Sequence, residues 1–376
     1  MSRVPPSWPT GRPGPCRIAI VGEAPGQDEV WAGAPFVGMS GQELTSQLAQ
    51  AGIDRSECLL TNVLSVRPAD NNLASLCVRK EDLPSDYPIH IGPMVTHGGN
   101  FYLRPDLLAE GARLREELAA AQPNVVIALG ATACWALLGD TGIGNLRGVV
   151  HRSVTSVPYK VVPTWHPAAI LRTWQWRPIA IADLAKAKRE SAYPEFRYDN
   201  FELWLEPELP DLHEFERLHI PPGSVVAPDV ETANGEITCI GFGVGETARR
   251  GLVIPFRTDP VTVGKGDSRR TLYTGNYWPS FAHERAAWLW VKRILEDRKD
   301  LQLVWQNGLY DIQYLIKHGI FATNSTHDCM LMHHSMYPEM DKSLGFLGSI
   351  YLNTQSWKQF GGKRGQKFAD DLKKDA

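Results

Sequence analysis

The stretch RIAIVGEAP, residues 17–25, is a short apolar run that ends in glycine, glutamate and proline. Such a run is typical of a buried strand whose carboxyl end opens into a loop. Three further segments have the same character: LLTNV (59–63), VVIALG (125–130) and KVVPTWHP (160–167). Helical patterns separate these segments, so the sequence predicts an α/β fold built on a parallel sheet.

Two helices are predicted between the strands. One begins at Ser40, where Glu43 three residues later completes a capping box, and it stops at Gly52. The other covers residues 107–118, where apolar residues recur on one helical face.

Polar residues stand where three of the strands end, namely Glu23, Asn62 and His166. Because ligands bind at the carboxyl ends of parallel strands, we expect these side chains to converge on one site. Taken singly, Asn62 is as well explained as a turn cap, and His166 as a buried histidine with satisfied hydrogen bonds. Their shared position favours a binding pocket.

The composition limits the possible functions. The 376 residues suffice for two ordinary domains. Lys and Arg number 39 against 42 Asp and Glu, a net charge of −3, so any nucleic-acid contact must come from local patches. The six cysteines are scattered, which argues against a disulfide framework and suits a cytoplasmic protein. No segment is typical of a signal peptide or long enough to span a bilayer, so no membrane partner is expected.

The chain divides into two predicted domains, 15–190 and 223–376. Residues 1–14 are rich in proline and are predicted to form a disordered arm. Residues 191–222 are acidic, aromatic and proline-rich with weak periodicity, and we interpret them as a linker. In the second domain we predict strands at 224–232, 237–245 and 251–256, the last two as an antiparallel pair, and helices at 282–297 and after Asn307.

Three motifs of the first domain belong together: GEAPGQDEVWAGAPFVGMSG (22–41), TNV (61–63) and HPAAI (166–170). In order and spacing they resemble the family 4 uracil-DNA glycosylases across roughly residues 15–190. The resemblance implies a three-layer αβα domain that binds single- or double-stranded DNA and reads an extruded uracil in a pocket.

The resemblance assigns Ala24, Phe36 and Asn62 to the base pocket. Phe36, which alone is as well explained as a core residue, stacks on the base. Asn62 accepts from uracil N3–H and donates to O4, and His166 donates to O2 as the base leaves as an anion. Ala24 stands where the best-known uracil glycosylases carry an aspartate, so the identity of any general base stays open.

Further roles follow from the same resemblance. Glu23 and Glu29 match the catalytic carboxylates of the pocket, which orient water or stabilise the developing sugar cation. Residues Pro167 to Arg172 form the DNA-binding loop that enters the minor groove, with Leu171 or Ile170 as the apolar wedge.

One feature departs from the family. Family 4 enzymes hold a four-iron cluster on four cysteines, and such a cluster requires thiolates. Here Cys16 stands alone near the N-terminus, Val66 occupies an expected cysteine position, and the segment 69–104 carries only Cys77. The sequence therefore predicts that no iron–sulfur cluster binds.

The second domain carries paired carboxylates. Asp229 and Glu231 lie two apart on a strand and leave the same face. Asn307 and Asp311 lie four apart on one helix face. An Asp-x-Glu pair alone is as well explained as an ordinary exposed strand end. With HDCMLMHHSMYPEMDKSLGFLGSIYL (327–352), the pattern resembles the 3′–5′ exonuclease domain of family A DNA polymerases, a ribonuclease H-like fold with a mixed sheet.

This resemblance implies that Asp229, Glu231 and Asp311 are catalytic and bind two divalent ions, Mg²⁺ or Mn²⁺. The histidines and cysteine of 327–334 follow no standard zinc spacing, so a helix starting at Asp328 is the favoured interpretation. The family's last motif, a tyrosine followed by an aspartate, is absent from the final residues, KFADDLKKDA. We therefore expect the exonuclease domain to lack one metal ligand.

The two domains in this order resemble the N-terminal region of DNA polymerases of the phage SPO1 type. The resemblance implies a replication or repair protein in a host cytoplasm, with a separately encoded polymerase domain as a partner. Three functions stay open at this point: an active glycosylase and exonuclease, an inactive sensor of uracil or a modified base, and a scaffold.

Overall fold

The computed structural model describes residues 2–88, 92–95, 99–197, 201–245, 249–263 and 270–352. These residues form two compact units. The first comprises residues 2–197 together with 345–352, and the second comprises residues 201–344.

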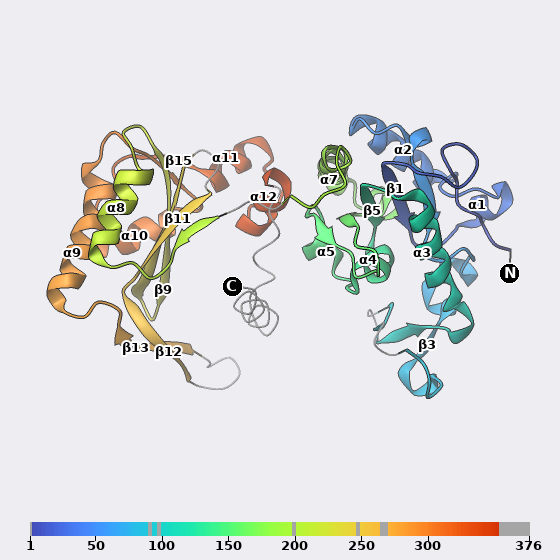
Figure 1. Cartoon of the computed structure of the whole chain (residues 1–376), viewed down its shortest axis with the longest axis horizontal. Coiled ribbons are helices and arrows are strands. Elements are labelled where there is room, and N and C mark those ends of the chain that lie inside the picture. Colours follow the sequence, from blue (N-terminus) through green and yellow to red (C-terminus); the bar gives the residue numbers. More distant parts are fainter. Residues whose placement is uncertain are drawn as a thin grey trace. The chain divides into compact units, whose positions relative to one another are not determined.

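The first unit is built on a five-stranded sheet of order β2-β1-β5-β7-β6 (Figure 1). Four strands run parallel and coincide with the four predicted apolar segments, while the short β6 pairs antiparallel with β7. Their bounds are Ile18–Gly22 for β1, Leu59–Asn62 for β2, Val125–Leu129 for β5, His151–Arg152 for β6 and Lys160–Thr164 for β7. The predicted α/β class and parallel sheet are confirmed.

Helices cover both faces of this sheet because its strands are apolar on both sides (Figure 1). Ala19 and Val21 of β1 pack with α3 and α4, whereas Ile18 and Ile20 pack with α2 and α7. The helices are α1 (Gln27–Ala32), α2 (Met39–Gln50), α3 (Ala109–Ala121), α4 (Ala131–Leu138), α5 (Ile143–Leu146), α6 (Pro167–Arg172) and α7 (Arg177–Glu190).

Two local features of the first unit differ from the sequence predictions. Helix α2 begins at Met39 with Gly38 as its N-cap, and Glu43 binds Gln47 and Arg177 instead of closing a capping box. The arm predicted to be disordered at 1–14 lies along β2 through backbone bridges, among them one from Ser7 to Leu60.

The 69–104 segment forms a small ribbon of its own. Strands β3 (Cys77–Arg79) and β4 (Phe101–Leu103) pair antiparallel, and single helical turns precede them at Ala69–Asn71 and Leu73–Leu76. The side chains of Leu76 and Leu103 are buried in the core that also holds α3.

The second unit is built on a mixed six-stranded sheet of order β15-β14-β9-β10-β11-β8 (Figure 1). Strands β9, β10 and β11 are antiparallel neighbours, and β14, β15 and β8 join them in parallel pairings. The bounds are Glu202–Trp204 for β8, Val225–Ala233 for β9, Glu236–Val244 for β10, Arg250–Pro255 for β11, Gln302–Trp305 for β14 and Ser325–Asp328 for β15. The predicted mixed sheet and antiparallel pair are confirmed.

A separate two-stranded ribbon, β12 (Arg257–Val263) with β13 (Arg270–Asn276), follows β11. The helices of the unit are α8 (Leu209–His219), α9 (Phe281–Lys292) with a π-helical continuation at Arg293–Asp297, α10 (Leu309–Lys317) and α11 (Cys329–Met336). Helix α12 (Leu344–Tyr351) follows, and its residues from 345 on belong to the first unit. Asp328 caps α11 by accepting from the N–H groups of Met330 and Leu331, which confirms the predicted helix start.

The range 191–222, which we interpreted as a linker, contains β8 and α8. The side chains of Leu212 and Phe215 on α8 are fully buried in the core of the second unit. This range therefore contributes to the fold from residue 202 on. In neither unit is any helix of the described residues long and apolar enough to cross a lipid bilayer.

Candidate functional site

Two of the residues predicted to form the pocket, Phe36 and Asn62, lie close together at the carboxyl ends of β1 and β2. The parallel register places Gly22 beside Asn62. A Cβ on Gly22 would lie 2.4 Å from Asn62 Oδ1 and 2.6 Å from Phe36 Cζ. Because real Cβ atoms avoid such distances, glycine is what allows the Asn62 amide and the Phe36 ring to meet at this edge.

Phe36 is held in an unusual backbone conformation. Its φ of 57° lies in the left-handed region, which is costly for a phenylalanine. Its N–H donates to the Glu29 carboxylate, and its carbonyl oxygen accepts from Arg55 Nη2 at 2.7 Å. Gly41 packs so closely beneath that carbonyl that any side chain there would collide with it. These contacts fix the position of a buried ring at the site.

The two predicted carboxylates have different surroundings. Glu29 is buried, and its two oxygens accept from the N–H groups of Gly26 and Phe36, so in this structure it organises the loop that carries the ring. Glu23 is half-buried, and its Oε2 accepts from Thr132 Oγ1 at 2.6 Å. The predicted catalytic roles of both residues stay predictions.

Asn62 has one satisfied and one unsatisfied oxygen. Its backbone carbonyl accepts from Arg113 Nη2 at 2.6 Å. Its side-chain Oδ1 is buried and has no hydrogen-bond partner in the part of the chain that the structure describes. Burying an amide oxygen without a partner costs about 1–3 kcal/mol. A ligand that donates an N–H at this position would remove that cost.

His166 is the N-cap of α6. Its Nδ1 accepts from the Ala168 N–H at 3.2 Å, which leaves the ring proton on Nε2. Burial, with a smaller effect of the positive charge on Arg172, lowers the pKa of His166 to about 4. At neutral pH the ring is therefore a neutral hydrogen-bond donor. His166 packs against Gly130, directly after β5, where an added Cβ would lie only 3.1 Å from the Cβ of His166.

The α6 segment separates the residues predicted to contact DNA. Pro167 and Ile170 are buried, and Ile170 is fully enclosed in the interior. Leu171 and Arg172 are exposed. Of the two apolar residues predicted as the wedge, only Leu171 has a free side chain, because Ile170 is needed for packing.

Comparison with known proteins shows the family of the first unit. Residues 8–195 match the family model of the uracil DNA glycosylase superfamily. The chain belongs to this superfamily. Three relatives are named type-4 uracil-DNA glycosylases: one from Archaeoglobus fulgidus, 32% identical over 45% of this chain and 74% of the relative; one from Thermotoga maritima, 31% identical over 46% and 76%; and one from Pyrobaculum aerophilum, 30% identical over 41% and 68%.

Two arginines of this glycosylase-superfamily unit were not predicted from the sequence, although each binds a residue that is predicted to form the pocket. Arg55 binds the carbonyl of Phe36, and Arg113 binds the carbonyl of Asn62. Arg113 lies 51 residues from Asn62 in the sequence. No periodicity or local motif reports such a contact, because it exists only after the helix has packed on the sheet.

The described cysteines do not fit the iron–sulfur cluster of family 4 enzymes, which requires thiolates. Burial raises the pKa of Cys77 to about 11 and those of Cys58 and Cys134 to about 12. Among the described residues, no three His, Cys, Asp or Glu side chains are grouped to hold a metal ion. Val66 is buried, and its backbone bridges to Arg3. That no cluster binds stays a prediction.

The match to the superfamily ends at residue 195 and leaves the second unit unassigned. Its predicted carboxylates lie on β9 and α10. Asp311 is buried, and its Oδ1 accepts from the Val230 N–H at 2.7 Å, which ties the helix to the strand beside Asp229 and Glu231. These three residues are near enough to interact electrostatically.

The pKa values of Glu231 and Asp311 reflect that interaction, whereas that of Asp229 reflects burial alone. Burial raises the pKa of Asp229, and burial with the charge of Asp229 raises that of Glu231. Burial, with smaller effects of both neighbours, raises the pKa of Asp311 to about 6. Even so, within the described ranges the three are not grouped as a ready-made set of metal ligands. The Asp328 carboxylate accepts backbone N–H groups at two helix starts.

Proposed function

We propose that the first unit binds an extruded uracil between Phe36 and Asn62 and hydrolyses its bond to deoxyribose. The observation that carries this proposal is the buried Oδ1 of Asn62, which has no partner among the described residues and lies beside the Phe36 ring. An aromatic ring and an amide with an open acceptor are the elements needed to stack a base and read its edge.

The amide favours uracil over cytosine. Uracil carries a donor at N3 and an acceptor at O4, which match the oxygen and the nitrogen of the Asn62 amide. Cytosine carries an acceptor at N3 and a donor amine at the neighbouring position. It would leave the buried Oδ1 unsatisfied, and that loss is on the order of 1–3 kcal/mol.

His166 supplies the electrostatic part of the reaction. As the bond between C1′ and N1 breaks, its electron pair moves to the base, and the negative charge grows on O2. The Nε2–H of the neutral ring donates to that oxygen, and a fixed neutral donor is ready without reorganisation. Water adds to C1′, and the base takes up its proton. Glu23, held by Thr132, is our candidate for orienting that water.

The exposed end of α6 is our candidate for the contact with DNA. Leu171 offers an apolar side chain that enters the duplex or the single strand when a nucleotide leaves the stack, and Arg172 offers a phosphate partner. The net charge of −3 makes such local contacts the main source of DNA affinity.

The test is excision from a labelled single-stranded oligonucleotide that holds one uracil, in EDTA. We expect cleavable abasic sites with uracil and none with cytosine. Asn62→Asp should weaken this discrimination, because a carboxylate accepts where the cytosine amine donates. Binding to the uracil strand without excision would support an inactive sensor instead, and equal binding to uracil and cytosine strands would contradict uracil recognition altogether.

For the second unit we propose a 3′–5′ exonuclease that works with Mg²⁺ or Mn²⁺. The supporting observation is that Asp311 is bonded to the strand between Asp229 and Glu231, and that burial raises the pKa values of all three, with the charge of Asp229 adding to the rise for Glu231 and Asp311. A divalent cation would stabilise the charged carboxylates. A bound cation activates water and stabilises the leaving oxygen. Because the three carboxylates are not grouped as ligands within the described residues, the cation would have to draw them together.

The exonuclease test is degradation of 3′-labelled single-stranded DNA with and without Mg²⁺. We expect weak Mg²⁺-dependent degradation, because the three carboxylates are not grouped as metal ligands within the described residues. Asp229→Ala should abolish it. Degradation that survives Asp229→Ala or EDTA would exclude this site as its source.

A further inference from the structure

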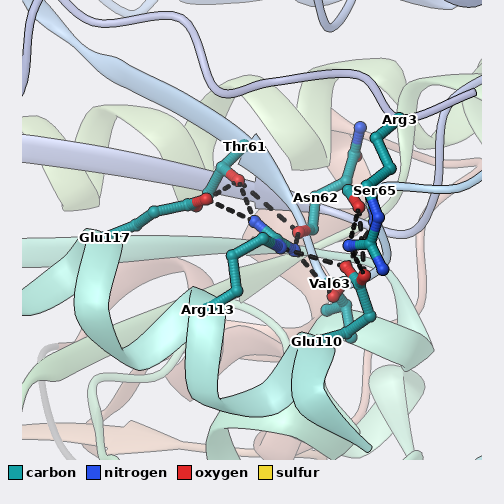
Figure 2. A network of polar contacts seen from close by, with 8 residues as sticks. All are labelled: Arg3, Thr61, Asn62, Val63, Ser65, Glu110, Arg113 and Glu117. Atoms are coloured by element: carbon teal, nitrogen blue, oxygen red, sulfur yellow. Dashed lines mark hydrogen bonds and ion pairs between the residues drawn. The ribbon is translucent and has the colours of Figure 1, made fainter. Parts of the chain in front are cut away.

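A polar network on the face of the sheet beside α3 surrounds Arg113 (Figure 2). A guanidinium group has five N–H bonds, and here each of them finds an acceptor. The acceptors are Glu110 Oε2 at 3.0 Å, Glu117 Oε1 at 2.5 Å, Thr61 Oγ1 at 3.3 Å, the Asn62 carbonyl at 2.6 Å and the Val63 carbonyl at 2.9 Å.

Three of these acceptors belong to consecutive residues, Thr61 to Val63, at the end of β2. Figure 2 shows Arg113 against the backbone of this segment, with the Asn62 side chain leaving on the other side. Arg113 does not touch the pocket. It holds the Thr61 hydroxyl before Asn62 and the carbonyls of Asn62 and Val63, in the two peptide groups that follow the Asn62 side chain, and so it sets where the amide points.

The arginine is itself held rigidly. The carboxylates of Glu110 and Glu117 are almost fully buried, and they lie one turn to either side of Arg113 on α3. Glu117 Oε2 also accepts from Thr61 Oγ1 at 2.6 Å, and Glu110 Oε2 accepts from the Ser65 N–H at 2.8 Å. The helix is thus bonded to the strand end on both sides of Asn62.

The N-terminal arm closes the network. Arg3 Nη1 donates to Glu110 Oε1 and to Ser65 Oγ at 3.1 Å, and the Val4 N–H donates to the Ser65 carbonyl at 2.8 Å. Two arginines therefore balance two glutamates. This balance allows charged groups to be buried next to the pocket without leaving either carboxylate unpaired.

We propose that Arg113 is a specificity-determining positioning residue, which acts on the base only through Asn62. This inference rests on the proposed uracil recognition. Two hydrogen bonds between an amide and a base require alignment of both partners, and a displacement of about 1 Å is enough to cost on the order of a hundredfold in rate. Lysine cannot replace the arginine, because three donors on a point charge cannot bind two carbonyls and two carboxylates in one plane.

The first experiment is a double-variant cycle in the full chain, with Arg113→Lys, Asn62→Ala and both together, measured as single-turnover excision of uracil. We expect Arg113→Lys to slow the parent by about tenfold or more and to have no further effect on Asn62→Ala, because the target of its action is gone. Equal slowing in both backgrounds would overturn the proposal, since general damage to the fold does not depend on residue 62.

The second experiment reads Asn62 directly. In the free protein, the NMR signals of the Asn62 side-chain amide should move or broaden in Arg113→Lys and stay in place in Arg115→Met, a control on the exposed face of the same helix. Unchanged Asn62 signals in Arg113→Lys would overturn the proposal. This readout needs no activity, so a parent that fails to excise uracil refutes the proposed function without deciding the role of Arg113.

A milder variant covers the case in which Arg113→Lys does not fold. Thr61→Val keeps the shape of the side chain and removes both one acceptor of Arg113 and the hydroxyl that donates to Glu117. We expect the Asn62 side-chain signals to move relative to those of the parent, with a smaller change in excision rate than for Arg113→Lys. Asn62 signals identical to those of the parent in Thr61→Val would count against the network as the source of the alignment.

Discussion

The polar edges of the two units are organised in opposite ways. At the end of β2, the described charges are paired, arginine with glutamate, and the atom left without a partner is the neutral Oδ1 of Asn62. Between β9 and α10, burial raises the pKa of three carboxylates, the charge of Asp229 adds to this rise for Glu231 and Asp311, and no described lysine or arginine forms an ion pair with them. The first arrangement suits a neutral ligand that brings hydrogen bonds. The second suits a ligand that brings positive charge.

The largest effect that we expect concerns the site of the first unit, which suits a neutral ligand. His166→Ala should lower the rate of uracil excision by about a hundredfold or more, because it removes the fixed donor to the developing anion. The rate should be the same with EDTA, since no described group of the first unit is arranged as a metal site. Single-turnover excision measures both statements. An unchanged rate in His166→Ala would mean that another group stabilises the leaving base.

The next effect concerns the space at the end of β1. Gly22→Ala places a methyl group 2.4 Å from Asn62 Oδ1 and 2.6 Å from the Phe36 ring, so both must move. We expect excision to slow by about tenfold or more, as for other displacements of positioning groups. The thermal unfolding midpoint should change little from that of the parent. Gly14→Ala is the matched control, because nothing lies within 4 Å of its added Cβ. Equal rates for the two variants would place the base elsewhere.

The sequence predicted the sheet of the first unit because its strands are uninterrupted apolar runs buried on both faces. Such short apolar runs are compatible with few structures other than a buried strand, and parallel strands bring their carboxyl ends to one edge of the sheet. That reasoning placed Asn62 beside the turn after β1, as the register confirms. It also anticipated the antiparallel β10 and β11 pair and the Asp328 cap.

The features that the sequence did not predict depend on contacts between segments that are distant in the chain. The pairing of Arg113 with Asn62, and of Arg55 with Phe36, leaves no local pattern in the sequence. Helix α8 was missed because prolines around its start, Pro207 and Pro210, are typical of a linker, whereas Pro210 here lies in the first turn, where proline is tolerated. Ile170 was offered as a wedge because the sequence alone did not show which side of α6 faces the core.

A smaller effect concerns the three carboxylates of the second unit, which suit a positively charged ligand. Mg²⁺ should raise the unfolding midpoint of the second unit, since a ligand at a hundred times its Kd stabilises a fold by about 2.7 kcal/mol. Asp229→Asn should unfold at a higher temperature than the parent without Mg²⁺, because it removes one repelling charge, and it should lose the response to Mg²⁺. Calorimetry of the full chain measures both. A parent whose midpoints ignore Mg²⁺ would contradict cation binding by these carboxylates.

The smallest effect is a contrast in the response to acid. The pKa of His166 is lowered from 6.5 to about 4, so the unfolded chain takes up a proton before the folded one does. Its contribution to stability is complete above pH 6.5 and is lost as the pH falls towards 4. The pKa of Asp311 is raised from 3.8 to about 6, so the folded chain takes up the proton first, and stability is gained over nearly the same range. The effects of the two residues on stability therefore oppose each other, and the stability curve of the parent alone does not reveal either.

The variants His166→Gln and Asp311→Asn separate the two effects, because neither new side chain titrates. Between pH 6.5 and 4, the unfolding free energy of the parent should fall relative to His166→Gln and rise relative to Asp311→Asn. Excision should show no inflection near pH 6.5 in the parent, because the donor ring stays neutral until about pH 4. Parallel stability curves for the parent and His166→Gln would mean that the folded protein does not lower the pKa of this histidine.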